Sequence, residues 1–166
     1  MKLPRIPRST DVEAITDATP EQVWAVVSDV TRIGEWSHEC RTGQWLDGAT
    51  GPAPGARFRG CNRVGLVRWG RVCTVTEARA PSRLTYRTFG TIVRDATQWT
   101  IAVHAAGTGS RIVLSYEMLA MPRWFETVVV LVMPPHRNRT AALHADLERL
   151  GEVARQTATA AGHAVG

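Results

Sequence analysis

Arg71 is the residue of this sequence whose position most strongly suggests a chemical role. It stands in the stretch RWGRVCTVTEA, where Cys73 and Val75 recur at every second position and predict the buried face of a strand. Counting by twos puts Arg71 on the same face. A buried guanidinium keeps its charge, so it needs acceptors from the protein or from a ligand's oxygens. Glu77 has the same parity and is the expected partner, although a bulge at Gly70 would turn Arg71 to solvent.

The histidines and cysteines give weaker indications of chemistry. The five histidines form no metal-ligand spacing, and the three cysteines are widely spaced without a C-x-x-C pair, so we expect no metal site and no disulfide. His104 has the outward parity of its strand. His136 lies on the inner stripe of a predicted helix, near the expected mouth of a cavity, and is a candidate general acid or base.

Motifs of the common enzyme classes are absent from the sequence. It contains no G-x-S-x-G, no H-E-x-x-H and no phosphate-binding glycine loop, and GTGS at 107–110 is typical of a hairpin turn. We therefore expect no cofactor.

Composition predicts one globular domain over residues 1–166, since 44% of the residues are hydrophobic and 21% are charged. A net charge of +5 and a pI near 9.8 would suit an acidic partner such as nucleic acid or an anionic membrane face. The arginines, however, are scattered from Arg5 to Arg155 without a run, so a solvated basic surface is favoured and no nucleic-acid partner is expected. The start MKLPRIPRSTDVEA has no apolar core of secretory length, which predicts a cytoplasmic protein.

The first third of the chain predicts a strand followed by two short helices. RSTDVEAIT at 8–16 alternates as a strand does. Thr19 and Pro20 then give the start chemistry of a helix, whose apolar face carries Val23, Val26 and Val27. A second helix, TRIGEW, is too short to be stable without packing against something larger.

After Gly43 the pattern changes to a period of two. Five stretches of this kind predict strands, namely GARFRGCNRV, RWGRVCTVTEA, SRLTYRTF, ATQWTIAVHA and RIVLSYEML, and CRTGQWL predicts one more directly after the helices. Short links with glycine, proline or serine separate most of them and favour hairpins. With the first strand, the sequence predicts a seven-stranded antiparallel sheet with one apolar face.

The C-terminal third predicts the element that covers this apolar face. From Pro135 onward, apolar residues follow a helical period for about six turns, and charged residues such as Asp146 fall elsewhere on the circumference. We expect Leu143, Leu147 and Leu150 to face the sheet. The preceding WFETVVVLVM is far shorter than the ~20 residues that span a bilayer, so it is expected to be a buried connection, and no stable membrane insertion is predicted.

Two stretches carry a resemblance to a known family. They are ATPEQVWAVVSDVTRIGEW, where a Pro-x-x-Val-Trp helix runs into a Glu-Trp pair, and RNRTAALHADLERLGE near the end. Together with the order of elements, they resemble the START and pollen-allergen-like (SRPBCC) superfamily, and within it the polyketide cyclase/dehydrase group, over nearly the full chain. The resemblance implies an α+β helix-grip fold, in which a curved sheet wraps around a long C-terminal helix.

The family implies a cavity between sheet and helix, and the alternation supports one. The side chains expected to line it are Phe58, Trp69, Tyr86, Thr88, Trp99, Tyr116, Met118, His136 and Leu143. The aromatase/cyclase branch is thought to polarise a polyketide carbonyl with an inward arginine and nearby hydroxyls. Arg71 and Tyr86, with Thr88, are the residues that would serve here if the protein is a cyclase.

Three functions follow from these observations. The first is binding of a hydrophobic small molecule, for transport or sequestration, which needs no acid or base. The second is a polyketide aromatase/cyclase that uses Arg71 and Tyr86. The third is a protein-binding regulator that uses the same fold as a partner surface. A monomer or homodimer is expected in each case.

Overall fold

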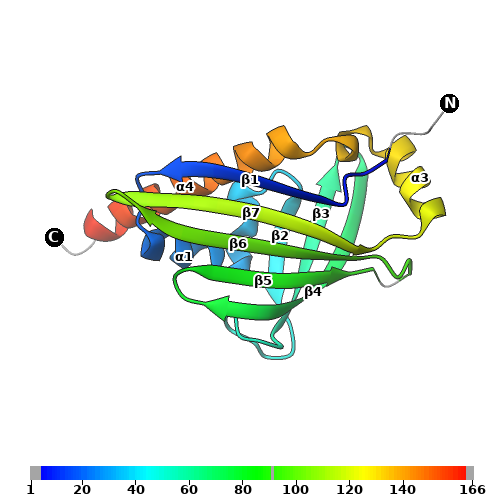
Figure 1. Ribbon diagram of the computed structural model, residues 1–166. Coiled ribbons are helices and arrows are strands. Elements are labelled where there is room, and N and C mark those ends of the chain that lie inside the picture. The colour runs from blue at the N-terminus through cyan, green and yellow to red at the C-terminus, as the bar shows by residue number, and fades with distance from the viewer. Residues whose placement is uncertain (1–4, 91, 164–166) are drawn as a thin grey trace.

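The structure, a computed structural model, describes residues 5–90 and 92–163. Within this part of the chain the strands form a seven-stranded antiparallel sheet in the order β1-β7-β6-β5-β4-β3-β2 (Figure 1). The elements along the chain are β1 (Ser9–Thr16), α1 (Pro20–Val27), η1 (Val30–Arg32), α2 (Ile33–Trp36), β2 (Cys40–Trp45), β3 (Arg57–Val64), β4 (Val67–Arg79), β5 (Arg83–Phe89), β6 (Ala96–Ala106), β7 (Gly109–Ala120), α3 (Arg123–Val132), η2 (Pro134–Arg137) and α4 (Thr140–His163). The predicted helix-grip architecture is confirmed.

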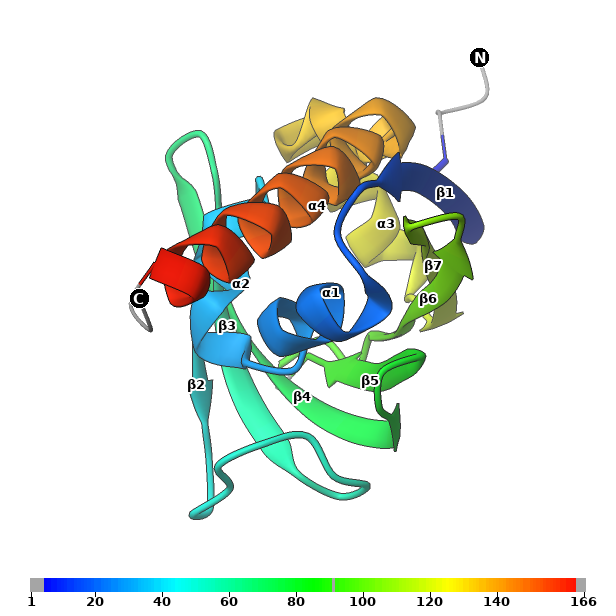
Figure 2. The same ribbon diagram turned by 90° about the vertical axis from the view of Figure 1, so that its left-hand side faces the viewer.

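The long helix α4 lies across the open side of the curved sheet (Figure 2). Leu147 and Leu150 are fully buried and Leu143 is nearly so, in one core with Ile112 and Leu114 of β7. Side chains three and four residues apart share one face of a helix, so these leucines form a single stripe. The prediction that this stripe faces the sheet is confirmed.

The first short helix begins as its sequence predicts. The Gln22 backbone N–H donates to Thr19 Oγ1 at 3.4 Å, and the Thr19 backbone N–H donates to the Gln22 side chain at 2.9 Å. Pro20 occupies the first turn, where no N–H is needed. Val23 and Val26 are fully buried, and α1 lies between α4 and the sheet (Figure 2). One end of the space under α4 is therefore filled by α1.

The long helix begins later than the periodicity predicts. The expected start is Pro135, but His136 lies on the separate short turn η2 and α4 begins at Thr140. Between them Asn138 has an extended backbone, and its side chain accepts a hydrogen bond from the Thr140 backbone N–H at 3.1 Å. Two prolines followed by asparagine favour a turn and a new helix start over a continuous helix. His136 consequently belongs to the turn that precedes α4.

The segment before that turn is a helix with one exposed side, so the prediction of a buried connection is wrong. Val129 and Val130 of α3 are buried, whereas Trp124 and Leu131 are exposed. The helix lies at the end of the sheet opposite the C-terminal end of α4, where the protein covers only one of its sides (Figure 1). None of the helices within the described residues is long and apolar enough to cross a membrane.

Candidate functional site

A cavity of about 460 Å³ lies between the inner face of the sheet and the first turns of α4. All the side chains that the sequence predicted for its wall lie there, namely Phe58, Trp69, Tyr86, Thr88, Trp99, Tyr116, Met118, His136 and Leu143. The exposed residues Val67, Ile92, Val128 and Val132 line its outer part. The cavity therefore opens to the surface beside α3, at the end that α1 does not fill.

Aromatic rings form much of the cavity wall. Phe58 and Tyr86 pack edge to face with ring centroids 5.2 Å apart, and Trp99 and Tyr116 lie at the same separation. Tyr86, Trp99 and Tyr116 are paired across the neighbouring strands β5, β6 and β7, and Phe58 reaches the same face from β3, on the far side of β4. Such rings offer a large apolar surface to a ligand.

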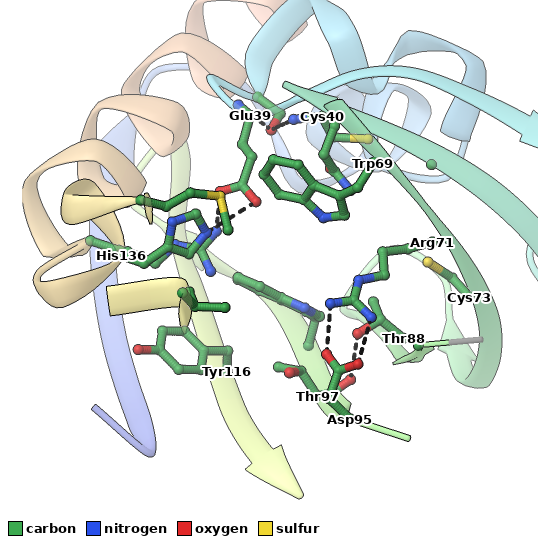
Figure 3. Close-up of a pocket in the computed structure, with 18 of the residues that line it drawn as sticks. Glu39, Cys40, Trp69, Arg71, Cys73, Thr88, Asp95, Thr97, Tyr116 and His136 are labelled. Carbon is green, nitrogen blue, oxygen red and sulfur yellow. Dashed lines mark hydrogen bonds and ion pairs between the residues drawn. The ribbon is translucent and has the colours of Figure 1, made fainter. Parts of the chain in front are cut away.

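Arg71 lies on the cavity wall and is held by Asp95. Arg71 Nη1 donates to Asp95 Oδ1 at 2.8 Å, and Nη2 donates to Oδ2 at 2.6 Å, so the pair is bidentate (Figure 3). Asp95 is buried, and Arg71 keeps part of its surface accessible to the cavity. A Cβ at Gly90 would collide with Asp95 Oδ1 and approach Arg71 Nη1, so the pair needs glycine at this position.

The predicted partner of Arg71, Glu77, is not its partner in the structure. The Gly70 position does not bulge, since β3 and β4 pair without a break from Arg57 to Val64, but the pairing of β4 with β5 shifts between Val75 and Glu77. This irregularity turns Glu77 to the outer face, where its carboxylate lies 2.8 Å from Arg79 Nε. The parity count is therefore right for Arg71 and wrong beyond Val75.

A second polar group, on another side of the cavity, centres on Glu39 (Figure 3). Arg139 Nη2 donates to Glu39 Oε2 at 2.6 Å, and His136 Nε2 lies 3.5 Å from Oε1. Burial by itself would raise the pKa of Glu39, but His136 and the Arg139 charge outweigh it and hold that pKa below its ordinary value. The Arg139 guanidinium also lies over the rings of Trp99 and Tyr116, 5.2 and 5.9 Å from their centroids.

This group continues into a second layer through His38 and Asp146. The backbone N–H of His38 donates to Asp146 Oδ1 at 2.8 Å, and His38 Nδ1 lies 2.7 Å from Oδ2. His38 Nε2 is 3.9 Å from Glu39 Oε2. Asp146 is buried, which corrects the prediction that it lies off the buried stripe of the helix. Asp146 is three residues from Leu143 and therefore lies on the same face of α4, where His38 covers its carboxylate.

The remaining reactive side chains of the wall are neutral. Burial raises the pKa of the Cys73 and Cys40 thiols to about 12, so neither is a thiolate nucleophile near neutral pH. Burial also raises the pKa of Tyr86 well above its usual value. The Tyr116 hydroxyl donates to the carbonyl of Pro7 at 3.1 Å, so its ring rather than its hydroxyl serves the cavity.

Sequence reasoning missed most of the charged partners at this site. Asp95 stands in a connection without periodicity, and Glu39 in a short link after α2, so no pattern points them inward. Arg139 and Asp146 could have been found, because both belong to RNRTAALHADLERLGE, one of the two stretches that carry the family resemblance. A charged residue in the buried stripe of a helix needs a partner, and that need marks Asp146.

Residues 7–154 match the protein family described as polyketide cyclase / dehydrase and lipid transport. No curated protein sequence gives a significant match. The family match confirms the resemblance predicted from the sequence.

Solved structures show the same fold. The crystal structure of TTHA0849 from Thermus thermophilus is similar with a TM-score of 0.70 at 15% identity, covering 90% of this chain and 98% of that one. The polyketide-cyclase-like protein Cgl2372 from Corynebacterium glutamicum gives 0.55 at 25% identity, with 93% and 94% covered. Ara h 8.0201 gives 0.56 at 12% identity, with 89% and 97% covered.

Proposed function

Because the chain belongs to the polyketide cyclase/dehydrase and lipid transport family, we propose that it binds a hydrophobic small molecule in the cavity beneath α4. The observation that carries this proposal is the aromatic-walled cavity of about 460 Å³, which opens beside α3. Its volume falls in the range of roughly 300–1,000 Å³ that small-molecule sites occupy. The opening gives the ligand a way in and out, as transport or sequestration requires.

The charges on the wall favour a neutral ligand. Arg71 is paired with Asp95, and Arg139 with Glu39, so each guanidinium faces the cavity together with a carboxylate. A ligand anion would approach a carboxylate as closely as a guanidinium and would lose its hydration as well. The ligand that fits is an uncharged hydrophobe with few oxygen atoms.

The same pairing argues against a cyclase role for Arg71. Polarising a carbonyl requires donors and positive charge aimed at the developing oxyanion, whereas the Asp95 carboxylate neutralises the charge of Arg71 and fixes its guanidinium toward itself. Tyr86 alone, as a neutral phenol, is a weak substitute. Binding without chemistry is therefore the function that this arrangement supports best.

A pair of related dyes tests the proposal. N-phenylnaphthylamine is a neutral hydrophobe, and ANS is its sulfonated, anionic relative. We expect the neutral dye to bind with a blue-shifted emission, and ANS to bind at least about tenfold more weakly because its sulfonate would be desolvated beside a carboxylate. Native mass spectrometry of freshly purified protein should also detect a co-purifying hydrophobe.

Two matched tryptophan variants test whether the dye binds inside the cavity. Thr88→Trp fills the cavity and should abolish binding, whereas Thr74→Trp puts the same side chain on the outer face of β4, where binding should persist. Equal binding by both variants, or no binding of the neutral dye by the unmodified protein, would overturn the proposal.

A further inference from the structure

The outer side of α3 is apolar along its whole length. Trp124, Val128, Leu131 and Val132 recur at helical spacing on this side, and Trp124 and Leu131 are 63% and 60% exposed. The inner side carries the buried residues Val129 and Val130 together with one acid. The only acid of the helix, Glu126, is buried and accepts hydrogen bonds from the Ile6 backbone N–H and the Arg8 side chain. A helix side as apolar as the exposed side of α3 is normally covered by another part of the protein or by a partner.

Two loop tips at the same opening also present apolar side chains. Leu66, in the turn between β3 and β4, is 94% exposed, and Ile92, between β5 and β6, is 93% exposed. Ile92 and Val67, the neighbour of Leu66, both line the outer part of the cavity, as do Val128 and Val132. We call the set Leu66, Val67, Ile92, Trp124, Val128, Leu131 and Val132 the mouth surface.

The mouth surface lies in three segments of the chain, residues 63–68, 90–95 and 119–137. Among the described residues of these segments, every exposed charged side chain is positive. They are Arg63, Arg68, Arg94, Arg123 and Arg137. The acids of these segments, Asp95 and Glu126, are buried and paired with Arg71 and Arg8. An apolar centre with a basic rim is thus the chemistry presented at the opening of the cavity.

We propose that the mouth surface docks reversibly on an anionic lipid bilayer. The apolar side chains enter the boundary between headgroups and acyl chains, and the arginines contact lipid phosphates. Docking would bring the opening of the cavity against the acyl chains and let a hydrophobe pass between bilayer and cavity. This transfer route rests on the proposed ligand binding, whereas the docking itself does not.

Two features favour a bilayer over a second copy or another protein. Leu66 and Ile92 project singly from separate loops, a shape that suits a fluid phase better than a flat complementary interface. Pairing two copies through this surface would bring their basic rims together, and like charges at an interface oppose association. Anionic lipid satisfies the apolar centre and the basic rim at once.

Sedimentation with lipid vesicles tests the docking. The intact protein should bind vesicles of phosphatidylcholine with phosphatidylglycerol, should not bind vesicles of phosphatidylcholine alone, and should dissociate as salt is raised. Leu131→Ser should weaken the partitioning by about tenfold or more. Ile15→Ser is the matched control, since Ile15 is 68% exposed on β1 away from α3, and it should bind as the unmodified protein does.

The charge contribution has its own matched pair. Arg94→Glu should weaken binding by about fivefold or more, and Arg83→Glu, at the opposite end of β5, should leave it nearly unchanged. Brominated acyl chains should quench part of the tryptophan fluorescence, and Trp124→Phe should remove that quenching without abolishing binding.

Several results would overturn the docking. They are equal binding by Leu131→Ser and Ile15→Ser, no preference for anionic vesicles, or a lipid-free dimer in ultracentrifugation that Leu131→Ser dissociates. If the unmodified protein binds N-phenylnaphthylamine but no anionic vesicles, the docking alone is overturned. The reverse result overturns the ligand proposal alone.

Discussion

The two ends of the space beneath α4 are built from the same sheet and the same helix, yet they are filled in opposite ways. At the closed end, Leu147 and Leu150 of α4 share a hydrophobic core with Val23 and Val26 of α1. At the open end the same helix contributes Leu143, and aromatic rings, paired charges and the cavity take the place of α1. One long helix therefore serves stability over part of its length and a binding site over the rest.

This difference teaches where substitutions should be tolerated. A side chain surrounded on all sides loses both its transfer free energy and its packing when it is truncated, whereas one that borders a cavity has less packing to lose. The closed end also fixes the angle of α4 over the sheet. The open end can then carry buried charges and a void without loss of the fold.

The largest expected effect compares two leucines of α4. Leu147→Ala should lower the free energy of unfolding by about 3 to 5 kcal/mol, and Leu143→Ala by about 2 kcal/mol or less, because Leu143 already borders the cavity. Urea denaturation of both variants measures the difference. Equal losses would show that the two ends of α4 are packed alike, and the comparison would fail.

A smaller loss is expected at the open end when a charge is left unpaired. Arg71→Leu should cost about 1 to 3 kcal/mol, because it leaves the buried Asp95 carboxylate without its partner. Adding Asp95→Ala should restore most of that loss, since both charges are then gone. Urea denaturation of the single and double variants gives the coupling.

Gly90→Ala offers an independent disruption of the same pair, because the added methyl group collides with Asp95. If Arg71→Leu were as stable as the intact protein, Asp95 would have another partner and the pair would not be the fixed element described above.

The contrast between the ends also separates what the sequence can predict from what it cannot. The strands, the caps of α1 and the leucines of α4 depend on local periodicity, so patterns of two and of three to four residues predict them. The direction of Arg71 follows for the same reason, because β4 is regular through Gly70.

The partners at the open end depend on contacts between distant segments. Asp95 reaches Arg71 from a loop, and Glu39 meets Arg139 across 100 residues of chain. The pairing irregularity after Val75 has no glycine or proline to announce it, so the parity count fails at Glu77. The outer side of α3 is apolar and yet exposed, because sequence hydrophobicity alone does not say whether a helix is covered by its own chain.

A moderate, pH-dependent effect is expected for Glu39. Its pKa is lowered in the folded state from the ordinary 4.5, so its ionised form stabilises the fold above that value, and the contribution is lost as the pH falls through the lowered pKa. Glu39→Gln should therefore cost about 1 to 2 kcal/mol at neutral pH. The difference from the intact protein should shrink as the pH falls below 4.5.

The control for this titration is Glu13→Gln, which removes an exposed ion pair between Glu13 of β1 and Arg111 of β7. An exposed pair contributes less than about 1 kcal/mol, so its stability difference should stay small throughout. A Glu39→Gln difference that stayed constant in acid would mean that the carboxylate is not the stabilising form. The charged group at the open end would then have a different protonation state from the one inferred here.

The smallest expected effect concerns the two tyrosines of the cavity wall. Tyr116→Phe should cost about 0.5 to 1.5 kcal/mol, because it removes the hydrogen bond to the Pro7 carbonyl and leaves that acceptor less satisfied. Tyr86→Phe should cost less, since the Tyr86 hydroxyl has no hydrogen-bond partner among the described residues. For ligand binding we expect the opposite order, with the larger effect from Tyr86→Phe. Tyr86→Phe should weaken a ligand whose oxygen meets that hydroxyl, and should leave binding of the oxygen-free N-phenylnaphthylamine unchanged. If Tyr86→Phe were instead the more destabilising of the two, its hydroxyl would serve the packing of the wall, and the open end would rely on aromatic surface alone to hold its ligand.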